Sequence, residues 1–256
     1  MDFIGYRPWG PIDSTVTMHE IWGLRGQLNA GVPAGLLTTP NCLPKLPGHP
    51  GNAYSYDGFQ VMYAIVEGSN DAELIENAVK QAEYLCRNGV RFVVGIAPEL
   101  AVCQKAVRNA VDIPVYMSPL CEMGWVAVAL GASQKYAVIT QEKSRITKEL
   151  VDVLGVDPKY YEKALIIDPE GYETFSSLKD HPTHYNAGKL RDEAVALCVK
   201  AKEDHPELGA ILLDSPDIMP FAADIQAAVD LPVYDTVTLV HYCVKFALKE
   251  HFYGYF

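Results

Sequence analysis

An internal repeat is the feature of this 256-residue sequence that most constrains its fold. The segment AVDIPVY at 110–116 recurs 118 residues later as AVDLPVY at 228–234. The same offset, carried backwards without a gap, pairs APE at 97–99 with SPD at 215–217. A match of this length indicates two copies of one supersecondary unit. The sequence therefore predicts two pseudo-symmetric lobes.

Short apolar runs alternate with amphipathic stretches along most of the chain, which is typical of parallel sheets with crossover helices. Strands are expected at 34–38, 91–95, 115–117, 136–140, 164–168, 209–214 and 233–235. Helices are expected at 71–88, 144–154, 187–203 and 236–249, with a serine cap at the start of the second. The expected fold class is α/β with parallel sheets.

The repeat also suggests how the chain divides. The first lobe is expected to take residues 1–118, completed by the C-terminal helix 236–256, and the second to take 119–235. Strand-to-helix turns at the carboxyl ends of two sheets would then face each other across a cleft, where α/β proteins bind ligands. The irregular segment 39–55 is rich in proline and glycine, and we expect it to line or cover that cleft.

The charge balance narrows the class of partner. The chain has 21 basic and 32 acidic residues, a formal net charge of -11, so it lacks the basic surface that nucleic-acid binding needs. No apolar run approaches the roughly 18 residues of a membrane span, and the N-terminus does not resemble a signal peptide. The 6 cysteines show no CxxC spacing and are expected to be reduced thiols. A soluble, cytoplasmic protein that acts on a small molecule is expected.

Three segments carry a resemblance to a known family. The stretch LGAILLDSPDIMPFAADIQAAVDLPVYDTVTL at 208–239 resembles the second active-site segment of the aspartate/glutamate racemase superfamily, which includes hydantoin racemases, maleate isomerases and arylmalonate decarboxylases. GVRFVVGIAPE at 89–99 resembles the first, and LPGHPGN at 46–52 is similar to a loop in one branch. The resemblance implies two flavodoxin-like lobes and cofactor-free chemistry, in which one cysteine per lobe removes or returns the proton next to a carboxylate.

Both catalytic cysteine positions of the family carry other residues here, Ala97 and Ser215. A thiol with a pKa of about 8.5 can be tuned into a base, whereas alanine cannot take a proton and serine needs a separate base. Racemisation by two thiols is therefore excluded for the sequence as it stands. Either the scaffold serves other chemistry, or the thiols were replaced to trap a ligand.

Glu99 and Asp217 are the local alternative as acid and base, because each lies two positions after a missing thiol. Paired carboxylates can divide these roles between them. The other interpretation is that both are first-turn acids that interact with helix amides and the helix dipole. Pro98 and Pro216 each remove one amide donor beside them, which makes these helix starts poorer anion sites.

Hydroxyl side chains follow three of the expected strands. Ser118 and Thr236 either hold a substrate carboxylate or cap the helices after them. Thr140 resembles a substrate-contacting threonine of the family, and His49 is either catalytic or a surface residue. The full expected substrate-binding set is Ser118, Thr140, Pro98, Pro216, Thr236 and His49.

The remaining reactive side chains give weaker signals. Cys42 and Cys121 are either reactive thiols near the cleft or small buried residues. His181 and His184 are expected to be solvated, so no metal site is predicted, and no GxGxxG pattern indicates a nucleotide cofactor. Four cysteines fall in expected helices and are assigned to the core: Cys86, Cys103, Cys198 and Cys243.

The residues and the resemblance together predict a cofactor-independent racemase or isomerase, or a cysteine-substituted inactive form of one. It would act by proton transfer at the α carbon of a small carboxylate substrate. A lyase or decarboxylase on the same scaffold, and a non-catalytic protein that binds a small ligand, are the alternatives. We expect a homo-oligomer without nucleic-acid or membrane partners.

Overall fold

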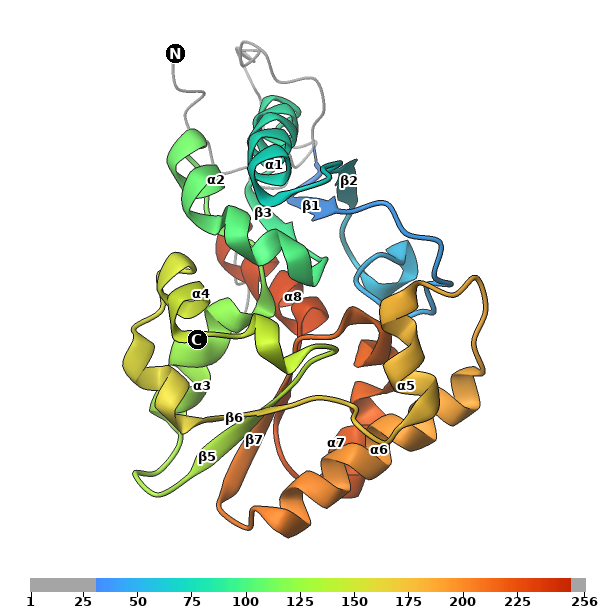
Figure 1. The fold of residues 1–256 in the computed structure, drawn as a ribbon. Coiled ribbons are helices and arrows are strands. Elements are labelled where there is room, and N and C mark those ends of the chain that lie inside the picture. The colour runs from blue at the N-terminus through green and yellow to red at the C-terminus, as the bar shows by residue number, and fades with distance from the viewer. Residues whose placement is uncertain (1–30, 250–256) are drawn as a thin grey trace, which may run out of the picture.

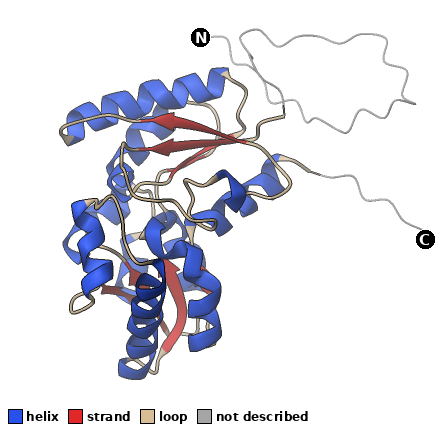
Figure 2. Ribbon diagram, turned by 90° about the vertical axis from the view of Figure 1, so that its right-hand side faces the viewer, coloured by secondary structure: helices blue, strands red, loops and turns tan. Residues whose placement is uncertain are grey.

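The computed structural model describes residues 31–249, which form two four-stranded sheets in which every pairing is parallel. Figure 2 shows the sheets as two separate groups of strands, one above the other, each flanked by helices. The first sheet has the order β2-β1-β3-β4 and the second the order β6-β5-β7-β8. The strands are β1 (Ala34–Thr38), β2 (Val61–Ile65), β3 (Phe92–Gly95), β4 (Val115–Tyr116), β5 (Lys135–Ile139), β6 (Ala164–Ile167), β7 (Leu208–Leu213) and β8 (Val233–Tyr234).

Each copy of the internal repeat forms the same unit in its own sheet, a strand, a 3₁₀ helix, an α-helix and a second strand. In the first copy β3 leads through a 3₁₀ helix, η2 (Pro98–Cys103), and α2 (Gln104–Ala110) to β4. In the second copy β7 leads through η7 (Pro216–Phe221) and α7 (Ala222–Val229) to β8. Both 3₁₀ helices begin with a proline, where the missing amide hydrogen costs no helical hydrogen bond. The predicted α/β fold with two similar lobes is confirmed.

Three of the four expected helices occur within two residues of their expected ends. The helix α1 begins where the Asn70 side chain accepts from the Glu73 amide at 3.1 Å. It ends at Arg87, and the C-cap Asn88 is followed by Gly89 in a left-handed conformation with φ of 92°. The described α-helices not yet given are α1 (Asp71–Arg87), α3 (Met123–Ala129), α4 (Lys148–Val153), α5 (Glu173–Ser177), α6 (Ala187–Asp204) and α8 (Thr236–Ala247).

Two expectations about elements were wrong. The helix expected at 144–154 begins only at Lys148, because Ser144 bonds to the Glu142 side chain and the amide of Leu150 is capped by Thr147 instead. The strand β2 was not expected at all. In the sheet, β2 has β1 as its single neighbour and so forms one edge of the first sheet.

The helix α8 follows the last strand of the second sheet but packs on the first sheet. Its buried residues Leu239 and Val240 share a cluster with Leu36, Phe92 and Val94 of β1 and β3. Figure 1 shows α8 in the middle of the molecule, between the two sheets. The exact lobe boundaries stay a prediction, and residues 1–30 and 250–256 of the expected first lobe lie outside the described residues.

None of the helices within residues 31–249 combines the length and the apolar character that crossing a membrane would take.

Candidate functional site

The carboxyl ends of β4, β5 and β7 meet where the two lobes meet. Ser118 follows β4 in the first lobe, while Thr140 follows β5 and Asp214 follows β7 in the second. Thr140 Oγ1 donates to Asp214 Oδ2 at 2.9 Å, and Ser118 Oγ donates to Asp214 Oδ1 at 3.5 Å. All three residues are buried. Asp214 therefore joins the lobes at the strand ends where α/β folds place their sites.

Burial raises the pKa of Asp214, although the hydroxyls of Thr140 and Ser118 and the charge of Arg145 favour its ionised form. Glu99 raises the same pKa further, so its carboxylate lies within electrostatic range. A hydroxyl has one hydrogen to donate. While Ser118 and Thr140 donate to Asp214, neither has a hydrogen left for a substrate carboxylate.

The capping interpretation holds for Ser118, whose Oγ accepts from the Leu120 amide at 3.1 Å at the start of η3 (Pro119–Glu122). It is wrong for Thr236. The residue that caps α8 is Asp235, whose Oδ1 accepts from the Thr238 amide at 2.7 Å. Thr236 is the buried first residue of that helix.

Ala97 and Ser215 occupy the same place in the two lobes, each immediately before the proline that starts η2 or η7. Ala97 is buried and packs in the first-lobe core. Ser215 is fully buried, and its Oγ has no hydrogen-bond partner among the described residues. Buried hydroxyls without a partner are rare and cost free energy. The Ser215 hydroxyl is therefore an unsatisfied polar group close to the carboxyl end of β7.

The segment 39–55 reaches from the first lobe to the second. In Figure 1 it follows β1, in blue and cyan, and runs toward α5. It also contacts α8, where His241 Nε2 lies 3.1 Å from the Ser55 carbonyl oxygen. Tyr185 of the second lobe donates its hydroxyl hydrogen to the carbonyl of Pro44 at 3.0 Å. Gly48 packs so closely on η7 that a Cβ there would lie 2.7 Å from Pro220 Cα. We call residues 44–55 the strap.

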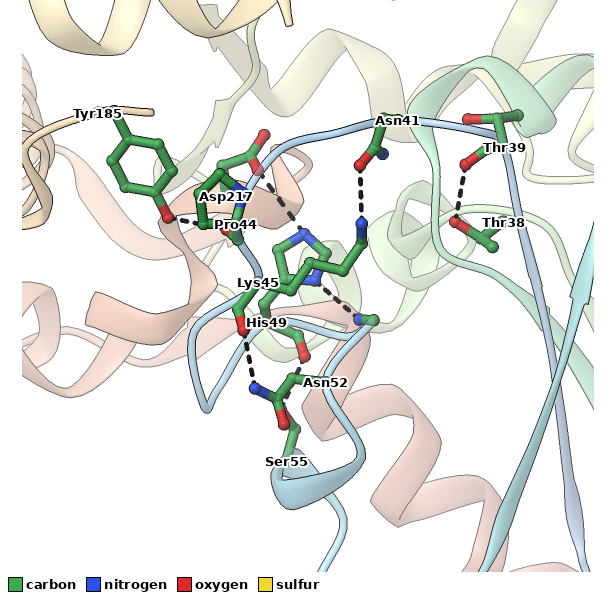
Figure 3. Close-up of polar contacts among 11 residues, drawn as sticks. Thr38, Thr39, Asn41, Pro44, Lys45, His49, Asn52, Ser55, Tyr185 and Asp217 are labelled. Carbon is green, nitrogen blue, oxygen red and sulfur yellow. Dashed lines mark hydrogen bonds and ion pairs between the residues drawn. The ribbon is translucent and has the colours of Figure 1, made fainter. Parts of the chain in front are cut away.

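Hydrogen bonds between residues of the strap stabilise its conformation. The Ser55 hydroxyl accepts from the Gly48 amide at 2.9 Å and donates to the His49 carbonyl at 2.7 Å. The Asn52 side chain donates to the Lys45 carbonyl at 2.8 Å. These bonds fix the loop as a compact unit, which holds His49 in place (Figure 3).

Each of the two acids of the repeat is contacted by the segment 39–55. Thr39 donates its hydroxyl hydrogen to Glu99 Oε1. His49 Nε2 lies 3.7 Å from Asp217 Oδ1, and both side chains are buried. Figure 3 shows the Asp217 carboxylate pointing toward the imidazole. The surface interpretation of His49 is therefore wrong.

Docking of the strap depends on Gly48, which has a φ of 96° as well as the close approach to Pro220. We expect Gly48→Ala to lower the free energy of unfolding by about 1–3 kcal/mol and to speed tryptic cleavage after Lys45, because it adds both backbone strain and a clash. Gly58→Ala is the matched control, since Gly58 has a φ of 83° and a Cβ there would meet nothing within 4 Å. Equal proteolysis rates in the two variants would contradict this account of docking.

The remaining candidates do not join this site. Burial raises the pKa of the Cys121 thiol to about 12, so it is not an activated nucleophile. Cys42, His181 and His184 are exposed. Three of the cysteines assigned to the core are buried and Cys86 is half-buried. In residues 31–249 no group of three or more His, Cys, Asp or Glu side chains could hold a metal ion.

Sequence reasoning missed Asp214 and Thr39. Asp214 stands directly before Ser215, but its equivalent in the first copy of the repeat is Ile96, so the repeat did not select it. An acid at the end of a fully apolar strand could have marked it, because a buried carboxylate needs donors. No local signal pointed to Thr39.

No protein-family model matches the chain. Among curated proteins it is similar to a dimethylsulfoniopropionate lyase of Durusdinium sp. clade D, with 24% identity over 218 residues that cover 78% of this chain and 70% of that protein. Dimethylsulfoniopropionate lyase 7 of Emiliania huxleyi (strain CCMP1516) is 26% identical over 210 residues, covering 74% of this chain and 59% of the relative. The match covers 44% of lyase 5 and 52% of lyases 6 and 3 of the same organism, so the chain spans about half the length of these relatives.

Solved structures resemble the chain over 84% of its length. An arylmalonate decarboxylase matches with a TM-score of 0.55 and 19% identity over 92% of that chain. An aspartate racemase homologue from Pyrococcus horikoshii OT3 matches with a TM-score of 0.55 and 14% identity over 98% of its chain. The allantoin racemase from Klebsiella pneumoniae gives a TM-score of 0.52 and 18% identity over 89%. The chain has the two-lobed fold of the aspartate/glutamate racemase superfamily.

Proposed function

We propose that this protein is a cofactor-independent lyase. It removes the proton next to the carboxylate of a small carboxylic acid and expels a leaving group from the neighbouring carbon. The substrate class is a carboxylate with a positively charged leaving group, of which dimethylsulfoniopropionate is the example. The observation that carries the proposal is the unequal chemistry of the two lobes at Ala97 and Ser215.

An elimination needs one base, whereas racemisation by proton transfer needs an acceptor on one face and a donor on the other. Ala97 offers no such group. Around Ser215 the structure has a free buried hydroxyl and the carboxylates of Asp214 and Asp217. One-sided proton abstraction fits this arrangement better than the racemase or isomerase interpretation.

The charge of the site supports a cationic leaving group. Asp214 and Asp217 lie on either side of Ser215 in the sequence and are buried, and Glu99 acts electrostatically on Asp214. Buried negative charges attract a cation strongly and repel a second carboxylate. A zwitterion with a sulfonium group brings a cation and a single carboxylate to the site. It therefore fits the negative charge of the site better than a dicarboxylate does. The names of the curated relatives support the same substrate.

For dimethylsulfoniopropionate the elimination balances without a cofactor. A base takes one hydrogen from the carbon next to the carboxylate, and the released electron pair forms the carbon–carbon double bond. The bond from the β carbon to sulfur breaks, and its electron pair leaves on sulfur. The products are acrylate, dimethyl sulfide and a protonated base.

The test is incubation of the purified protein with dimethylsulfoniopropionate, with dimethyl sulfide measured in the headspace and acrylate by liquid chromatography. We expect both products in equal amounts, above a heat-treated control. A parallel panel contains L-aspartate, L-glutamate, allantoin and an arylmalonate, and is followed by chiral chromatography and carbon dioxide release.

Racemisation of a panel compound without release of dimethyl sulfide would overturn the lyase proposal in favour of the isomerase. Decarboxylation of the arylmalonate alone would favour the decarboxylase. Saturable binding of the sulfonium compound without any turnover would assign the protein to the ligand-binding class.

A further inference from the structure

The imidazole of His49 has no lone pair to spare. The Gly51 amide donates to His49 Nδ1 at 2.8 Å, so the Nδ1 lone pair is occupied. In the neutral ring the proton is then on Nε2, which faces Asp217 Oδ1 at 3.7 Å. His49 in this arrangement turns an N–H toward a carboxylate and is not a proton acceptor.

Asp217 is the carboxylate that remains available. Its Oδ1 is fully buried with no hydrogen-bond partner among the described residues, while the side chain as a whole is 9% exposed. The exposed part therefore belongs to the rest of the side chain, whose other polar atom is Oδ2. Asp217 lies in the first turn of η7, two residues after Ser215.

The other two acids of the site are already engaged. Asp214 accepts hydroxyl hydrogens on both of its oxygens, from Thr140 and Ser118. Glu99 accepts from Thr39. Hydroxyl donors therefore occupy both oxygens of Asp214 and one oxygen of Glu99, which leaves Asp217 as the acid of the site that no hydroxyl holds.

We propose that Asp217 accepts the α proton of the substrate through Oδ2, and that His49 is the positioning residue that holds Oδ1. This assignment rests on the lyase function proposed above and names its base. The 3.7 Å separation is longer than a hydrogen bond, and contacts of this kind commonly shorten when substrate binds. The strap thus places His49, a residue of the first lobe, next to Asp217, the proposed catalytic base in the second lobe.

The proton transfer leaves Asp217 neutral, with the proton on Oδ2, while the electron pair of the broken carbon–hydrogen bond forms the double bond of acrylate. His49 keeps its Nε2 proton throughout. Asp217 returns its proton to water once the products have left. No second proton carrier and no oxidant or reductant is required.

Three variants separate the base from the residue that positions it. Asp217→Asn removes the base, and we expect release of dimethyl sulfide to fall at least about 1000-fold.

His49→Asn places an amide oxygen near Nδ1, which preserves an acceptor for Gly51 but leaves nothing to reach Asp217. His49→Gln places an amide nitrogen near Nε2, which preserves the donor to Asp217. We expect kcat to fall about 100-fold in His49→Asn and less than about 10-fold in His49→Gln, with KM changed less than about 3-fold in both.

Two further measurements test the role of His49 without relying on the rate of dimethyl sulfide release. Thermal unfolding of the two His49 variants shows whether strap docking is weakened equally, in which case their difference in kcat is not a folding effect. Nitrogen-15 chemical shifts of His49 in the unchanged protein should show an unprotonated Nδ1 and a protonated Nε2. A protonated Nδ1 would overturn the positioning role.

The outcomes distinguish this assignment from the lyase proposal. Release of dimethyl sulfide that persists in Asp217→Asn overturns the assignment and leaves the lyase function intact. Equal loss of kcat in His49→Asn and His49→Gln overturns the role of His49. If the unchanged protein neither releases dimethyl sulfide nor exchanges α hydrogens of dimethylsulfoniopropionate in deuterated water, both proposals fail together.

Discussion

Asp214→Ala should lower the free energy of unfolding at pH 7 by about 3 kcal/mol, whereas Asp214→Asn should lower it by less than about 1 kcal/mol. Alanine leaves the buried hydroxyls of Thr140 and Ser118 without their acceptor and opens a cavity. Asparagine keeps an oxygen for Thr140, and its amide can donate to Ser118. It also removes a buried charge, and burial already raises the pKa of Asp214.

Urea unfolding at pH 7 measures both variants, and Thr140→Val completes a double-mutant cycle with Asp214→Ala, which removes the acceptor of the Thr140 hydrogen bond. We expect a coupling energy of roughly 1.5–3 kcal/mol between Thr140 and Asp214, since a hydrogen bond to a charged group contributes that much. Equal destabilisation by alanine and asparagine would mean that the charge of Asp214, and not its hydrogen bonds, stabilises the contact between the lobes.

The fold could be predicted because its determinants are local and occur twice. A buried parallel strand is an apolar run, and a proline after a small residue marks the start of η2 and η7, so each copy of the repeat supports the other. The edge strand β2 was missed although its sequence, VMYAI, is itself an apolar run. The cap of α4 was misassigned because Ser144 and Thr147 are both good capping residues, and only the contact between Ser144 and Glu142 decides between them.

The contacts of the site could not be predicted in the same way, because they join residues far apart in the sequence. His49 and Asp217 are separated by 168 positions, and Ser118 and Asp214 by 96. Sequence patterns selected His49, Asp217 and Ser118 as candidates, but did not show which residues each of them contacts. Only the path of the strap shows that His49 is buried, and no periodicity encodes that path.

A second large effect is expected at Glu122, which ends η3 beside α8. Glu122 is buried, and its Oε2 has no hydrogen-bond partner in the described part of the chain. Burial raises the pKa of Glu122 to about 8, and the nearby charge of Asp235 adds to the shift. The folded protein therefore holds a proton on Glu122 at neutral pH, whereas the unfolded chain, with an ordinary glutamate pKa near 4.5, does not.

The direction of the pH dependence follows from proton linkage. Between about pH 4.5 and 8 the folded state binds one more proton at Glu122 than the unfolded state, so the free energy of unfolding falls as pH rises through this window. Glutamine cannot ionise, so Glu122→Gln removes this loss. Relative to the unchanged protein, the variant should gain on the order of 3 kcal/mol between pH 5 and pH 8.

Chemical unfolding of both proteins at several values of pH from 5 to 8 measures this difference, and contributions of other groups largely cancel within each pair. Glu149→Gln is the matched control, because Glu149 is exposed and its pKa is lowered by hydrogen bonds at the start of α4. Its stability relative to the unchanged protein should stay level above pH 5. If the Glu122→Gln difference is also level from pH 5 to 8, Glu122 is ionised in the folded protein, and a cation or donor that pairs with it must then lie against η3 and α8.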